Sequence, residues 1–142
     1  MALTTRFRRH LATGLTAVLS AGIGYVGVSY LTAPESTAPS FGLSSWPEGE
    51  AATFLATKGA RDLASGVIPL TLLVTGHRRA LGWALVAEAL VPALDAALIL
   101  ATKGSTKAAL GVHGATAAAV LGTGVLLLTE PATGPAVDSA RA

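Results

Sequence analysis

The sequence predicts an all-α membrane protein, a bundle of four antiparallel transmembrane helices in the cell membrane with both termini in the cytoplasm. Three observations lead to this fold class. The 142 residues are 51% hydrophobic and only 13% charged, about half the charge of an ordinary soluble domain. The mean hydropathy is positive, at +0.60. Four long apolar stretches recur along the chain, each long enough for a helix to cross the hydrocarbon core.

The four expected spans are residues 11–31, 51–75, 80–101 and 108–128. Helices are favoured over a β-barrel because strict apolar–polar alternation is absent and the stretches are too long for barrel strands. The short connections 76–79 and 102–107 place consecutive helices side by side and antiparallel. Residues 1–10 form a basic cytoplasmic N-terminus and residues 129–142 a flexible cytoplasmic tail, so residues 11–128 make one domain.

Basic residues set the orientation, because cytoplasmic loops are enriched in lysine and arginine. With the N-terminus inside, six of them lie on the cytoplasmic side and two outside: Arg6, Arg8, Arg9, Arg78, Arg79 and Arg141 against Lys103 and Lys107. A cleaved signal peptide is the alternative for the first stretch. Its apolar run of 21 residues is longer than the usual 7 to 15 of a signal peptide, so we expect it to remain as the first span.

Several classes of site are disfavoured. There is no cysteine, which excludes disulfides and thiolate metal sites. A net charge of +2 with no basic, aromatic-rich face argues against a nucleic-acid partner. No phosphate-binding glycine pattern occurs, so no cofactor is expected. No metal is expected either, because the usual ligand spacings are absent and two basic residues in the second span would repel a cation.

Small residues are expected to hold the helices together, because apolar side chains gain little by leaving lipid for one another. On the fourth span, small residues recur at spacings of three and four, at Gly111, Gly114, Ala118 and Gly122. The first span offers a similar series at Ser20, Gly24 and Gly27. Both series are interpreted as packing surfaces.

Charged residues within the spans are the main functional signal. Lys58, Arg61 and Asp62 share one face of the second span, and Glu88 and Asp95 share one face of the third. Between the two acids, Pro92 leaves the Glu88 carbonyl without its helical donor and is expected to kink the helix. The fourth span adds His113. Apart from Glu88, which is about 20 Å from the outer end of its span, these groups lie about 8 to 17 Å from the outer ends.

Buried charges are costly in a bilayer, so these side chains must face inward and pair. Two basic groups oppose three acids, and neutrality therefore requires a protonated His113 or one neutral carboxyl group. We expect Arg61 to pair with Asp95 across the bundle, because adjacent residues such as Arg61 and Asp62 do not face each other on a helix. The alternative is purely structural: Arg61 and one acid would pin two spans together, and Glu88 would serve packing.

The string Lys58-Gly59-Ala60-Arg61-Asp62, followed by Gly66, Pro92-Ala93-Leu94-Asp95 and His113-Gly114, resembles a known group. It is similar to small four-pass bacterial and fungal membrane proteins of a domain-of-unknown-function family, loosely DoxX-like. The resemblance covers about residues 41–128. It implies a four-helix fold and a role for the matched positions, and it implies no activity.

The preferred hypothesis is acid–base processing of a lipophilic small molecule that enters from the lipid bilayer, by isomerisation, cyclisation or epoxide opening. The candidate catalytic residues are Arg61, Asp62, Asp95, His113, Lys58 and Glu88. Two alternatives stay open: a non-enzymatic subunit with a structural charged core, bound to a membrane partner or to a second copy, and a proton- or solute-coupled transporter. The sequence does not decide whether the chain is an enzyme.

Overall fold

The computed structural model describes residues 2–130, which are helical almost throughout and contain no strand. The long elements are α1 (Ala2–Thr32), α3 (Thr53–Val74), α4 (Arg78–Glu88), α5 (Leu90–Ala101) and α7 (Ala115–Leu128). Short elements join them: α2 (Pro34–Thr37), the 3₁₀ turns η1 (Ala38–Phe41) and η2 (Gly49–Ala52), α6 (Thr106–Ala108) and the π-helical turn η3 (Ala109–Gly114). The predicted tail beyond Glu130 lies outside the described residues.

Within this part of the chain, three helical segments are long and apolar enough to cross a membrane: Thr4–Thr32, Arg78–Ala101 and Thr106–Leu128. They indicate a membrane protein and coincide with the first, third and fourth expected spans. Helix α3 has 22 residues, which is long enough for a span. It is not among the three because its first half carries charged residues.

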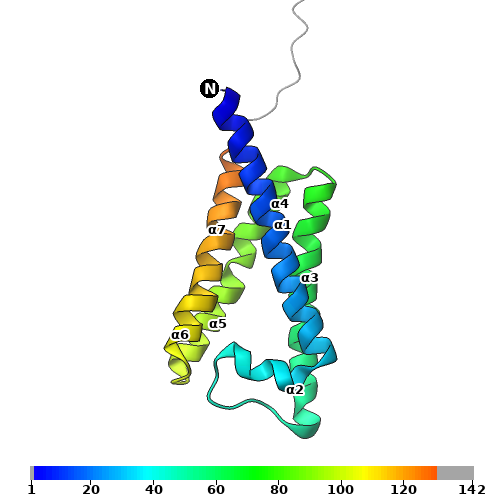
Figure 1. Ribbon diagram of the computed structural model, residues 1–142, viewed down its shortest axis with the longest axis vertical. Helices are drawn as coiled ribbons and strands as arrows, with labels where there is room; N and C mark the ends of the chain where they lie inside the picture. Colours follow the sequence, from blue (N-terminus) through cyan, green and yellow to red (C-terminus); the bar gives the residue numbers. More distant parts are fainter. Residues whose placement is uncertain (1, 131–142) are drawn as a thin grey trace, which may run out of the picture.

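The helices pack as two pairs, α1 with α3 and α4 with α7 (Figure 1). The pairs meet at the end where the chain begins, and they diverge toward the other end, where α2 and the following loop lie across the gap (Figure 1). At the end where the two pairs meet, here called the converging end, a core of buried residues holds them together. This core includes Ala12, Leu81, Leu85 and Leu127. A smaller core of Ala96, Ile99 and Ala109 lies at the diverging end, against Phe41 and Leu43 of the loop.

Glycines allow the two helices of each pair to approach closely. For α1, this confirms the packing role that the sequence predicts for its small residues. A Cβ added at Gly27 would collide with the backbone nitrogen of Leu63 on α3. A Cβ at Gly66 of α3 would lie 2.6 Å from the carbonyl oxygen of Ser20 on α1. In the second pair, a Cβ at Gly124 would lie 2.9 Å from the carbonyl oxygen of Gly82. These contacts explain why larger residues are absent at these positions.

The glycine series expected on the fourth span is wrong. A Cβ added at Gly111 or Gly122 would meet nothing within 4 Å, and one at Gly114 would lie 3.4 Å from the carbonyl oxygen of Ala109 within its own turn. The physical reason is the rotation of α7 about its axis: Gly124, about 200° around the helix from Gly122, is the glycine that faces Gly82 and Val86 of α4. The packing glycine of this segment is therefore Gly124.

Two further features shape the fold. Near Pro92, where the sequence predicts a kink, the regular helix is interrupted at Ala89: α4 ends at Glu88 and α5 begins at Leu90. At the converging end, Arg78 donates from Nε and Nη2 to the two carboxylate oxygens of Glu130, each at 2.6 Å. Its Nη1 also donates to Thr13 Oγ1 at 3.1 Å. Arg78 thus ties the start of α4 to the end of α7 and to α1, an ion pair that the sequence patterns had not indicated.

Candidate functional site

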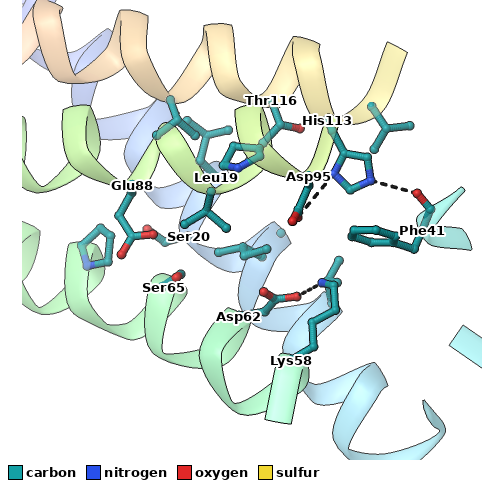
Figure 2. Close-up of a pocket in the computed structure, with 18 of the residues that line it drawn as sticks. Leu19, Ser20, Phe41, Lys58, Asp62, Ser65, Glu88, Asp95, His113 and Thr116 are labelled. Atoms are coloured by element: carbon teal, nitrogen blue, oxygen red, sulfur yellow. Dashed lines mark hydrogen bonds and ion pairs between the residues drawn. The ribbon is translucent and has the colours of Figure 1, made fainter. Parts of the chain in front are cut away.

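A cavity of about 470 Å³ lies between the two helix pairs, with walls from α1, η1, α3, α4, α5, η3 and α7. Its size falls within the range of small-molecule sites. Most lining side chains are apolar, and seven of the polar ones form two groups (Figure 2), while Tyr30, Ser40 and Thr116 also line the cavity. The first group, here called the charged end, consists of Lys58, Asp62, Asp95 and His113. The second, here called the serine end, consists of Ser20, Ser65 and Glu88.

At the charged end, Asp62 pairs with Lys58 one helical turn away on α3. Lys58 Nζ donates to Asp62 Oδ2, and the Asp62 side chain is only 2% exposed. The ammonium group also lies over two aromatic rings, 4.5 Å from the Tyr30 centroid and 5.2 Å from the Phe41 centroid. Such contacts stabilise a desolvated cation. Lys58 therefore points into the bundle rather than out to the membrane surface.

The second pair joins Asp95 on α5 to His113 in η3. His113 Nδ1 lies 3.7 Å from Asp95 Oδ2, and His113 Nε2 lies 3.0 Å from the carbonyl oxygen of Phe41. Because a carbonyl only accepts hydrogen bonds, Nε2 must carry a hydrogen and donate it. Nδ1 is then the ring atom turned toward the Asp95 carboxyl group, at an ion-pair distance that is too long for a direct hydrogen bond. The pair thus places a ring nitrogen with a lone pair beside a carboxyl group at the charged end.

The turn η1, which ends at Phe41, and the loop after it cover the charged end. Gly42 has φ +102°, a conformation that glycine adopts readily, and its carbonyl accepts a 2.7 Å hydrogen bond from Ser105 N. The Phe41 ring meets the His113 imidazole edge to face at 4.8 Å between centroids. Sequence reasoning missed Phe41, whose only signal is an apolar aromatic residue within a loop rich in proline and serine. It also missed η3, although π-helical turns are common at functional sites.

The expected Arg61–Asp95 pair is wrong. The Arg61 side chain is 54% exposed, its Nη2 lies 3.7 Å from Asp62 Oδ1, and the residue does not line the cavity. The reason is helical geometry, since Lys58, Asp62, Ser65 and Pro69 face the cavity from α3, and residue 61 is rotated about 100° from residue 62. Of the six candidate residues, the structure brings five to the cavity and leaves Arg61 outside.

Glu88 was expected at a different depth from the other charges. It does lie apart from them, yet it lines the same cavity, at the serine end (Figure 2). Ser20 and Ser65 join it there, although the sequence pattern indicated only packing for Ser20. Pro69 and Pro92 line the cavity as well. Because proline has no N–H, these two residues leave the carbonyl oxygens of Ser65 and Glu88 without the usual helical donor.

The charges within the cavity nearly balance. Lys58 and Asp62 neutralise each other, and Asp95 with His113 is neutral when the pair holds one proton. Glu88 is then the remaining acid. Among residues 2–130, no three histidine, aspartate or glutamate side chains gather closely enough to hold a metal ion. The arrangement offers proton donors and acceptors at the two ends of an apolar chamber.

Comparison with known proteins supplies a family and no activity. No curated protein and no solved structure matches the chain. Residues 20–127 match the family described as a domain of unknown function, DUF4267. The matched region begins within α1, ends within α7 and contains every helical residue that lines the cavity apart from Val18 and Leu19. Since it covers most of the sequence, the chain belongs to the DUF4267 family.

Proposed function

We propose that this protein is a small four-pass integral protein of the cell membrane whose cavity binds a lipophilic small molecule and transforms it by acid–base chemistry. The observation that carries the proposal is the pairing at one end of an apolar cavity: Asp95 faces His113, and Asp62 faces Lys58. Two acid–base pairs that line one chamber offer the proton donors and acceptors that general acid–base catalysis uses.

The four-pass topology makes α3 the second span. Helix α3 packs beside α1 along much of its length (Figure 1), and its buried acid points into the bundle rather than toward lipid. The arginines at residues 6, 8, 9, 78 and 79 lie at the converging end, whereas Lys103 and Lys107 belong to the diverging end. By the positive-inside rule, the converging end is cytoplasmic. This topology also suits the loose likeness to DoxX-like proteins.

In the proposed reaction, the Asp95–His113 pair donates its proton to a double bond or an epoxide oxygen of the bound molecule. The positive charge that develops on the substrate is stabilised by the carboxylate of Asp62 and by the ring faces of Tyr30 and Phe41. For isomerisation or cyclisation, a C–H proton then leaves the substrate to Asp62, and its transfer back to Asp95 or His113 restores the site. For epoxide opening, the C–O bond breaks as the epoxide oxygen takes the proton, and a water molecule adds to the carbon that loses this bond. The water gives one proton to Asp62, and transfer of that proton back to Asp95 or His113 restores the site.

The structural alternative has less support than it had from sequence. A structural pin would join two spans through Arg61, yet Arg61 is half exposed, and the Lys58–Asp62 pair lies within one helix. A merely structural core also needs no cavity of this size. The transporter alternative rests on the same acids in the cavity. It also requires a path for the proton or solute from the cavity to each side of the membrane.

The test is mass spectrometry of small molecules that co-purify with the wild type and with Asp95→Asn, using Arg61→Gln as the matched control outside the cavity. We expect the Asp95→Asn protein to express normally and to retain a discrete lipophilic molecule. Wild type and Arg61→Gln should instead carry its isomer or its hydrated product. If no such molecule accompanies any of the three, the enzyme proposal fails. A co-purifying protein would then favour the subunit, and pH-dependent flux in proteoliposomes the transporter.

A further inference from the structure

We infer that the serine end of the cavity, formed by Ser20, Ser65 and Glu88, binds the head of the lipophilic ligand, and that this head is a hydrogen-bond donor, a hydroxyl or an amino group. The inference rests on the proposed function, because it names the chemical class of the molecule that the cavity takes.

The first observation is the Ser20 hydroxyl. Ser20 is 5% exposed, and its Oγ is buried without a hydrogen-bond partner. Other hydroxyls of α1 donate to the carbonyl one turn earlier, as Thr16 does to Ala12 at 2.8 Å and Ser29 does to Tyr25 at 2.9 Å. A buried polar atom without a partner is costly, and natural proteins keep few of them. Since Ser20 lines the cavity, a bound ligand is the partner that this hydroxyl lacks.

The second observation is an excess of acceptors beside that hydroxyl. The Glu88 carboxyl has no hydrogen bond or ion pair with any side chain in the part of the chain that the structure describes, and neither has the Ser65 hydroxyl. The carbonyl oxygens of Ser65 and Glu88 lack helical donors because of Pro69 and Pro92. Each carboxyl oxygen can accept two hydrogen bonds and each of the two hydroxyls donates only one, so the acceptors among these side chains exceed the donors and the complementary ligand group is one that donates.

The third observation is the separation of the two polar ends. Glu88 and Asp95 are seven positions apart on consecutive helices, which corresponds to about 10 Å along the helix axis. Val91 and Pro92 line the cavity between them. A ligand that reaches both ends is therefore elongated, with its donor head at Glu88 and its reactive part beside Asp95 and His113. Binding of the donor head at Glu88 therefore determines that the opposite end of the ligand meets Asp95 and His113.

The experiment measures thermal unfolding of the full chain in phosphatidylcholine nanodiscs, followed by the fluorescence of Trp46 and Trp83. Three probes are titrated that share one apolar chain: farnesol, farnesylamine and farnesyl methyl ether, which accepts but does not donate. We expect the alcohol and the amine to raise the unfolding temperature of the wild type with half-saturation at about tenfold lower concentration than the ether, as a hydrogen bond to a charged group implies.

Ser20→Ala and Glu88→Gln should each reduce this preference. Ser20→Ala is safe for folding, because it removes a hydroxyl that has no partner. Thr16→Val is the matched control: it removes a buried hydroxyl of the same helix that does not line the cavity, and it should keep the preference. Equal half-saturation by alcohol and ether in the wild type, or an undiminished preference in both variants, would overturn the inference alone. If none of the probes shifts unfolding, the inference and the proposed lipophilic cavity both fail.

Discussion

Replacing Lys58 with methionine should destabilise the protein far more than the same change at Arg61. Methionine keeps much of the side-chain volume of either residue and removes the charge. Asp62 is 2% exposed and receives its close hydrogen bond from Lys58, whereas Arg61 is 54% exposed and lies 3.7 Å from the other carboxylate oxygen. The Asp62 carboxylate therefore depends mainly on Lys58.

The expected magnitudes differ clearly. Stranding a buried carboxylate by removing its partner costs about 3 to 5 kcal/mol, and we expect Lys58→Met to fall in this range. The loss of a half-exposed ion pair is about 0 to 1 kcal/mol, which we expect for Arg61→Met. Asp62→Leu should cost less than Lys58→Met, because Lys58 is 18% exposed and keeps its contacts with the rings of Tyr30 and Phe41. The double variant Lys58→Met with Asp62→Leu should recover part of the loss.

The assay is a double-mutant cycle on the free energy of unfolding in one detergent at neutral pH. Trp46 and Trp83 provide the fluorescence signal. A coupling free energy above about 1 kcal/mol between Lys58 and Asp62 would agree with the described pair. Strictly additive losses, or a larger loss from Arg61→Met than from Lys58→Met, would refute the geometry of the charged end.

Three further predictions concern the bundle. Gly66→Ala should destabilise by about 1 to 3 kcal/mol, because its Cβ would lie 2.6 Å from the Ser20 carbonyl oxygen, whereas Gly111→Ala has open space and should unfold like the wild type in a thermal scan. Arg78→Lys cannot keep both contacts with Glu130 and should lower stability by about 1 to 3 kcal/mol, while Arg79→Lys, at an exposed neighbour, should change little. An impermeant thiol reagent on intact cells should label Ser45→Cys but not Ser139→Cys; the reverse labelling would invert the proposed topology.

Composition and periodicity were sufficient to predict the helical class and the positions of three spans. These features depend on stretches of about 20 apolar residues, which are local in the sequence. The interruption at Ala89 was predictable in the same way, because the missing N–H of Pro92 acts within one helical turn. The inward position of Asp62 followed from the cost of exposing a carboxylate to lipid.

Partner choice and helix register were not predictable in this way. Assigning Arg61 to Asp95 required the rotation of α3 about its axis, and that rotation is fixed by contacts of Gly59 and Gly66 with α1. Uniform spacing along the fourth span selected Gly122, whereas Gly124, about 200° around α7 from it, is the glycine that faces Gly82 of α4. The contact of Phe41 with His113 spans 72 residues and depends on the path of a loop that has no periodic pattern.

The most direct test of the central proposal is conversion of the molecule that Asp95→Asn retains. After extraction from that variant, it is added to nanodiscs of the wild type, Arg61→Gln or Asp95→Asn, and followed by chromatography and mass spectrometry. The proposal predicts that wild type and Arg61→Gln convert it to an isomer or a hydrated product and that Asp95→Asn does not. Failure of the wild type to change the molecule, or equal conversion by Asp95→Asn, would contradict acid–base catalysis by the Asp95–His113 pair.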